Sequence, residues 1–209
     1  MSCWRQTTAI VTIYRARSFN DLILMVAKKL EDAESFAKHR HVHQIRKDGK
    51  TLYWVHLQQV VNHLKEIGIN NDDILCAGWL HDTIEDTNTD FDDIDEKFGT
   101  KVAEIVAELT KNKRLPRMER EAEYVMQLRN SSWQAQIIKL CDILANLADL
   151  PSSLELGEKK SDQVSNKLEY FDAIRSGLAK NREKFPNLDA VMKRLNEILK
   201  EYCKPPLRV

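Results

Sequence analysis

The chain has 209 residues, which is enough for one domain with a proper hydrophobic core. Lysine plus arginine equals aspartate plus glutamate at 32 each, so no net basic field argues for binding to nucleic acid or an anionic membrane. The four cysteines are widely spaced without a Cys-x-x-Cys pair, and no apolar stretch is long enough to span a bilayer. The expected compartment is therefore a reducing cytoplasm.

Helical spacing of apolar residues runs through almost the whole chain, and glycine (6) and proline (5) are sparse. We predict an N-terminal extension over residues 1–20 and a single all-α domain of about nine helices over residues 21–204. Asp90 and Thr100 are predicted helix N-caps, and Gly68 and Gly99 are predicted stops. The predicted helices cover residues 22–41, 55–67, the apolar run from 74 into the His-Asp pair at 81–82, 91–98, 101–111, 117–129, 133–150, 165–184 and 188–202.

The most informative segment is LHDTIEDT at residues 80–87, where one histidine and three carboxylates follow an apolar run. If the run is helical, His81 and Glu85 lie one turn apart on one face. Asp82 and Asp86 then do the same on the neighbouring face. A divalent metal would compensate these charges, since neutral imidazole and carboxylate are both good ligands. The alternative is an acidic helix end followed by a turn, and these eight residues alone leave both interpretations open.

Two further polar residues stand in apolar helical runs. Asp142 lies within residues 137–147, with Asn146 one turn beyond it, and His56 lies near the start of the second predicted helix. Taken alone, Asp142 is most simply a solvated residue on an outer helix face. His56 alone is most simply a hydrogen-bonded residue at the edge of the core.

Together, the ordered set His56, His81-Asp82 and Asp142 resembles the H…HD…D signature of the HD-domain metal-dependent phosphohydrolases. The surrounding sequence resembles the hydrolase domain of the RelA/SpoT family, and its size resembles the family's stand-alone small alarmone hydrolases, which include metazoan members. The resemblance extends from roughly residue 20 to roughly residue 200, and no synthetase or regulatory domain is expected. It is carried by HxxQxRKDG from residue 41, YxxH from 53, LHDTxEDT from 80, FG at 98 and KLxDxLxNL from 139.

The resemblance implies an HD-domain helical bundle that removes the 3′-pyrophosphate from guanosine tetra- and pentaphosphate. It implies Mn²⁺ or another divalent metal, held by His56, His81, Asp82 and Asp142. Open coordination positions on such an ion would admit water and a phosphate oxygen. The expected partner is a small guanine nucleotide, with neither nucleic acid nor membrane, and a homodimer is compatible with the sequence.

The same resemblance suggests roles for the other site residues. Glu85 and Asp86 would orient or deprotonate the attacking water, and Asn146 would hydrogen-bond Asp142 or the ribose side of the substrate. The expected substrate contacts are Arg46 stacked on guanine, Lys47 on phosphate, and Lys113 and Tyr170 at further positions. Without the resemblance, residues 46–47 form a solvated turn and Lys113 belongs to a solvated basic stretch.

The sequence departs from the family pattern at several positions. Ile143 follows the metal-ligating aspartate where Arg or Lys is usual, and Ala148 stands where Arg is common. Leu52 and Leu57 replace prolines, and His43 replaces glycine. These departures keep open a phosphohydrolase of the same fold that acts on another nucleotide, such as a nucleotidase or a ribose-phosphate phosphatase. Also open are a helical binding protein with a structural metal, which the intact acidic pair at 85–86 argues against, and a helical domain without metal.

Overall fold

The computed structural model describes residues 19–155 and 157–209, and within these residues the chain is all-α apart from one isolated antiparallel bridge between Ile45 and Leu52. The predicted fold class is thereby confirmed. The predicted extension over residues 1–20 lies almost entirely outside the described residues. The helices are α2 (Phe19–Arg40), α3 (Trp54–Ile67), α4 (Asp72–Leu80), α5 (Thr83–Asp86), α6 (Phe91–Phe98), α7 (Thr100–Leu109), α8 (Arg117–Asn130), α9 (Trp133–Asp149), α10 (Gly157–Lys180) and α11 (Leu188–Glu201), with short 3-10 turns at Leu150–Ser152 and Arg182–Lys184.

Each of the nine predicted helices is present, and most begin and end within two residues of the prediction. Two differ. The third is interrupted after Leu80, and a separate single turn, α5, follows. The helix predicted from residue 165 begins eight residues earlier, at Gly157. The apolar pattern does not reveal this start, because the first two turns are polar and carry little apolar periodicity. Asp90 is the N-cap of α6 as predicted and forms a capping box with Asp93, whereas Thr100 lies inside α7 rather than capping it.

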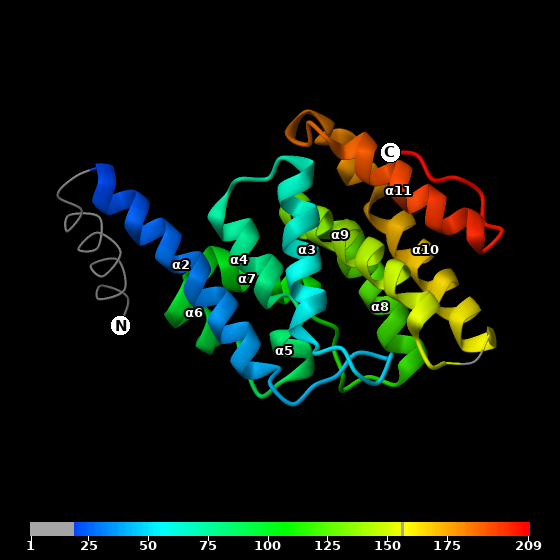
Figure 1. Ribbon diagram of the computed structural model, residues 1–209, viewed down its shortest axis with the longest axis horizontal. Coiled ribbons are helices and arrows are strands. Elements are labelled where there is room, and N and C mark those ends of the chain that lie inside the picture. The colour runs from blue at the N-terminus through cyan, green and yellow to red at the C-terminus, as the bar shows by residue number, and fades with distance from the viewer. Residues whose placement is uncertain (1–18, 156) are drawn as a thin grey trace.

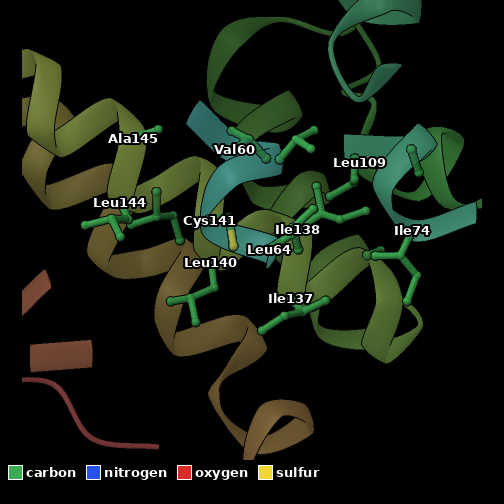
Figure 2. Packing of buried hydrophobic residues seen from close by; sticks show 14 of the residues in the cluster. Val60, Leu64, Ile74, Leu109, Ile137, Ile138, Leu140, Cys141, Leu144 and Ala145 are labelled. Atoms are coloured by element: carbon green, nitrogen blue, oxygen red, sulfur yellow. The ribbon is translucent and has the colours of Figure 1, made fainter. Parts of the chain in front are cut away.

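Helix α9 forms the centre of the molecule and packs against α3, α10, α7 and α4 (Figure 1). Twelve of its 17 residues are buried, so the helix is surrounded on most sides by other elements. Figure 2 shows side chains from α3, α4, α7 and α9 that pack together in one apolar cluster. The labelled side chains are Val60 and Leu64 from α3, Ile74 from α4, Leu109 from α7, and Ile137, Ile138, Leu140, Cys141, Leu144 and Ala145 from α9.

The close packing of α3 on α4 depends on Gly78. A Cβ atom at this position would lie 2.8 Å from Leu64 Cδ1 and 3.2 Å from Val61 Cγ2, closer than van der Waals contact allows. This approach brings the buried face of α3 close to the end of α4, where the polar segment 80–87 begins. None of the described helices is both long enough and apolar enough to cross a membrane.

Candidate metal centre and active site

Two histidines and two aspartates from three parts of the fold converge on one buried volume. His56 extends from α3, His81 and Asp82 follow the end of α4, and Asp142 lies in the middle of α9. The His81 Nε2–Asp82 Oδ2 distance is 3.1 Å and the His56 Nε2–Asp142 Oδ1 distance is 3.2 Å. The crossed distances, 3.7 Å from His56 to Asp82 and 3.8 Å from His81 to Asp142, join the same four atoms.

The imidazole nitrogens in this cluster fit a metal site. The Nε2 atoms of His56 and His81 are buried and make no hydrogen bond within the described residues. His81 Nδ1 lies 2.9 Å from the Gly78 carbonyl oxygen, so Nδ1 carries a proton and Nε2 faces the cluster, where it could bind a metal after losing its own proton. Two buried imidazole nitrogens facing two carboxylates form the donor set that a divalent transition metal takes.

The charges of the cluster also favour binding of a cation between its two carboxylates. Burial alone would lower the pKa of His81, but the Asp82 and Asp142 carboxylates outweigh burial and raise it to about 10. Burial lowers the pKa of His56, which keeps that ring neutral near pH 7. In the metal-free protein the protonated His81 ring lies between the two carboxylates, and Asp142 is also paired with Lys139. A bound divalent ion would take the place of the ring proton.

The two carboxylate oxygens of Asp142 have different environments. Oδ1 faces the histidines, while Oδ2 accepts a hydrogen bond from Lys139 Nζ at 2.8 Å. Asn146 Nδ2 donates to the Asp142 backbone oxygen at 3.0 Å and also to its Oδ1. Burial would raise the pKa of Asp142, but Lys139 and then Lys167 hold it well below its usual range. This aspartate is therefore an ionised and oriented carboxylate rather than the solvated residue that its sequence position alone suggests.

Asp82 is oriented by a phenol from a distant segment. Tyr53 Oη donates to Asp82 Oδ2 at 2.7 Å and lies 3.3 Å from Asp86 Oδ2. The Tyr53 ring stacks on buried His41 at 4.8 Å between centroids, and His41 Nδ1 lies 2.7 Å from Gln44 Oε1. The sequence pattern included these residues but indicated no role for them.

The segment 80–87 is not one continuous helix, which was one of the two interpretations that the sequence left open. His81 and Asp82 form a turn between α4 and α5, and Thr83 Oγ1 donates to the Leu80 carbonyl at 2.6 Å, so a side chain takes up a carbonyl at the end of α4. In α5, Glu85 Oε2 accepts a hydrogen bond from the Lys111 backbone N–H at 3.1 Å. Asp86 pairs with Lys113 Nζ at 2.6 Å. Burial and then the Asp82 charge raise the pKa of Glu85.

The predicted substrate residues Arg46 and Lys47 border a polar cleft of about 220 Å³ next to this cluster. Arg46 donates to Asp149 Oδ2 at 2.9 Å and to Asn146 Oδ1 at 3.1 Å, and its guanidinium carbon lies 5.5 Å from the centre of the Tyr53 ring. Lys47 Nζ donates to Gln163 at 2.8 Å across the cleft. The cleft is lined by residues 46–48, Thr51, Val55, Gln59, Asn146, Asp149, Leu150, Ser152, Ser153 and Gln163.

The remaining predicted residues, Lys113 and Tyr170, lie on the other side of the acidic pair. Lys113 is half-exposed against Asp86, whereas Tyr170 is buried and hydrogen-bonded to Glu121 and Lys111. Sequence reasoning missed three lysines here: Lys111, Lys139 and Lys167. Lys139 carried the only local signal, since it lies three residues before an aspartate in an apolar helical run and pairs with it.

The HD domain family model matches residues 33–172, which cover the whole cluster. Guanosine-3′,5′-bis(diphosphate) 3′-pyrophosphohydrolase MESH1 of Mus musculus is 35% identical over 175 residues, which cover 82% of this chain and 94% of that protein. MESH1 of Homo sapiens is 41% identical over 128 residues, which cover 59% of this chain and 70% of that protein.

Solved structures agree with the sequence relatives. A structure described as "A metazoan ortholog of SpoT hydrolyzes ppGpp and plays a role in starvation responses" superposes with a TM-score of 0.73 at 30% identity, covering 83% of this chain and 95% of that one. The fold and the His-Asp cluster are those of an HD domain hydrolase. The chain belongs to the HD domain family and, within it, to the family of the MESH1 pyrophosphohydrolases.

Proposed function

We propose that this enzyme hydrolyses the 3′-diphosphate of guanosine tetra- and pentaphosphate. Water adds to the 3′ phosphorus, the bond from that phosphorus to the ribose 3′ oxygen breaks, and the 3′ oxygen leaves with the electron pair and takes up a proton. The products are pyrophosphate and GDP or GTP. The MESH1 relatives carry this activity in their names, and the matching structure is described as that of a protein that hydrolyses ppGpp.

His56, His81, Asp82 and Asp142 would hold the divalent metal, for which we propose Mn²⁺. When bound, such an ion lowers the pKa of a coordinated water and withdraws charge from phosphoryl oxygens. The histidines contribute unpartnered Nε2 atoms, and Asp142 contributes the oxygen that faces away from Lys139. Mn²⁺ suits this mixed set of imidazole and carboxylate ligands, which is neither all oxygen nor rich in sulfur.

The observation that carries the proposal is the acidic pair beside the four ligands. A structural metal needs only the four ligands, yet Glu85 and Asp86 follow His81 and Asp82 within one turn and are partly buried beside them. Glu85 is part-buried with a raised pKa, which favours acceptance of a proton from water near neutral pH. Asp86 is held by Lys113 and Tyr53, so its role in our proposal is to orient that water.

The polar cleft fits a nucleoside next to the metal cluster. We propose that guanine lies against the Arg46 guanidinium, which already rests on an aromatic ring, and that Lys47 meets a phosphate. Asn146 connects the cleft to the metal ligand Asp142 and would contact the ribose side. Lys113 and Tyr170 would contact the 3′ substituent from the opposite side of the acidic pair.

The test is turnover of guanosine tetraphosphate by the purified protein with Mn²⁺, with pyrophosphate and phosphate separated as products. Release of pyrophosphate and GDP that stops on chelation is the expected result. Release of single phosphates from a panel of other nucleotides, without turnover of the tetraphosphate, would contradict the substrate and favour another nucleotide.

A further inference from the structure

Three lysines gather around the ring of Tyr170 and are named here the lysine cluster: Lys111, Lys139 and Lys167. Their Nζ atoms lie 4.9, 4.9 and 5.6 Å from the centre of that ring. They come from the segment after α7, from α9 and from α10, so the tertiary fold alone brings them together. Three ammonium groups at such short range repel one another unless anions compensate them.

The carboxylates in contact with the cluster leave one ammonium poorly compensated. Lys111 Nζ lies 3.0 Å from Glu121 and donates to Tyr170 Oη at 2.6 Å. Lys139 Nζ pairs with Asp142 Oδ2 at 2.8 Å. Lys167 Nζ lies 3.5 Å from that same oxygen, which is too far for a good hydrogen bond, and makes no other ion pair within the described residues. Two carboxylates therefore face three cations.

The poorly compensated cation is partly exposed and lies near the proposed active site. The side chain of Lys167 is 18% exposed, against 5% for Asp142 and 9% for Lys139. Lys167 lies one turn after Gln163 on α10, and Gln163 lines the polar cleft proposed to hold the nucleoside. On the other side, the Lys111 backbone N–H contacts Glu85 while its ammonium contacts Tyr170. The cluster therefore lies between the cleft and the acidic pair.

We propose that Lys167, supported by Lys111, binds the distal phosphoryl group of the substrate's 3′-diphosphate. This inference rests on the proposed function and adds a subsite for the second phosphate of the group that is removed. A phosphoryl dianion would supply the negative charge that the cluster lacks, through charge-assisted hydrogen bonds. Helix α9 carries a single basic residue, Lys139, so further cations for a diphosphate must come from other elements. The subsite would select a 3′-diphosphate over a 3′-monophosphate.

The experiment compares binding of two nucleotides by calorimetry: guanosine 5′-diphosphate 3′-diphosphate and guanosine 5′-diphosphate 3′-monophosphate. Both are titrated into Mn²⁺-loaded Glu85→Gln protein, in which turnover is slow. Lys167→Met is added to this background, with Lys167→Arg as the charge-conserving variant. Lys180→Met, at the exposed end of the same helix, is the matched control. The bound Mn²⁺ of each protein is measured by elemental analysis.

We expect the diphosphate to bind about 10- to 100-fold more tightly than the monophosphate, the range for one charge-assisted hydrogen bond. Lys167→Met should remove most of this preference, and Lys167→Arg and Lys180→Met should retain it. Equal weakening of both nucleotides, no weakening, or loss of Mn²⁺ would overturn the proposal, the last by showing that Lys167 acts through Asp142. Turnover by the unsubstituted enzyme tests the proposed function separately. The diphosphate preference can be observed without turnover, and turnover can be observed without the preference.

Discussion

The two parts of the proposed metal site that carry its aspartates, α9 and the segment 80–87, are built in different ways. In α9, Lys139, Asp142 and Asn146 lie three and four residues apart on one unbroken helix and orient one another. In the segment 80–87 the helix breaks, and the functional side chains are held by residues far away in the sequence, such as Tyr53 and Lys113. The first part is local and buried, and the second depends on loops near the surface.

This difference predicts that substitutions in the two parts should have different main effects. Changes in the segment 80–87 should act first on metal binding and turnover, because the loops that hold it carry little of the core. Changes in α9 should act first on stability, because its polar side chains are surrounded by apolar packing and have few alternative partners.

The largest effect is expected from His81→Ala or Asp82→Ala. Either change removes one of the four proposed ligands, so bound metal and turnover should both fall to background. Metal content after gel filtration and turnover of guanosine tetraphosphate check this. His39→Ala, an exposed histidine on α2, should change neither. Full metal content in both variants would contradict the proposed ligand set.

Glu85→Gln should leave the metal bound but lower turnover by about 10²–10⁴-fold, the range for lost acid–base assistance. The amide keeps the size of the side chain and can still meet the Lys111 backbone, so folding should be unaffected. Steady-state kinetics with Glu104→Gln as the exposed control measure the effect. Unchanged turnover would remove Glu85 from the mechanism.

Lys139→Met tests the α9 part. Asp142 would lose its closest cation while buried, and we expect the free energy of unfolding of the metal-free protein to fall by about 3 kcal/mol. Urea titration followed by circular dichroism measures this. Lys101→Met breaks an exposed pair with Glu104 and should cost less than about 0.5 kcal/mol. Similar losses in both variants would show that burial of the Asp142 pair is not decisive.

Tyr53→Phe is expected to have the smallest effect, about tenfold weaker Mn²⁺ binding or turnover, which is the lower end for a group that orients a ligand. The ring remains to stack on His41, and only the hydrogen bonds to Asp82 and Asp86 are lost. Calorimetric titration of Mn²⁺ measures the change, with Tyr202→Phe as the control. A loss of stability larger than the loss of affinity would identify Tyr53 as a core residue instead.

Most of the fold could be predicted from the sequence because helical spacing and terminators act locally. Gly68 and Asp90 end and begin helices as expected, since their roles depend only on their own backbone neighbours. The first turns of α10 were missed because polar residues leave no periodic signal. The separate turn α5 could not be predicted, because the side chain of Thr83 takes up the Leu80 carbonyl and the apolar pattern does not reveal this contact.

The candidate site was predicted where motif order carries information and missed where only tertiary contacts do. His56 and Asp142 each looked ordinary alone, and only their order with the His-Asp pair indicated a shared site. Lys111 and Lys167 gave no signal, because a lysine on a polar helix face or in a loop has the same pattern whether it meets solvent or a buried tyrosine. Their positions follow from the packing of α10 beside α8 and α9.

The amide of Asn146 has a consequence for how ligands bind together. Its Nδ2 donates to Asp142 and its Oδ1 accepts from Arg46, so one side chain is shared by a proposed metal ligand and the polar cleft. A nucleotide that changes the hydrogen bonds of Arg46 thus changes those available to Asp142. Any resulting coupling free energy is reciprocal: if the nucleotide tightens the metal by a given factor, the metal tightens the nucleotide by the same factor.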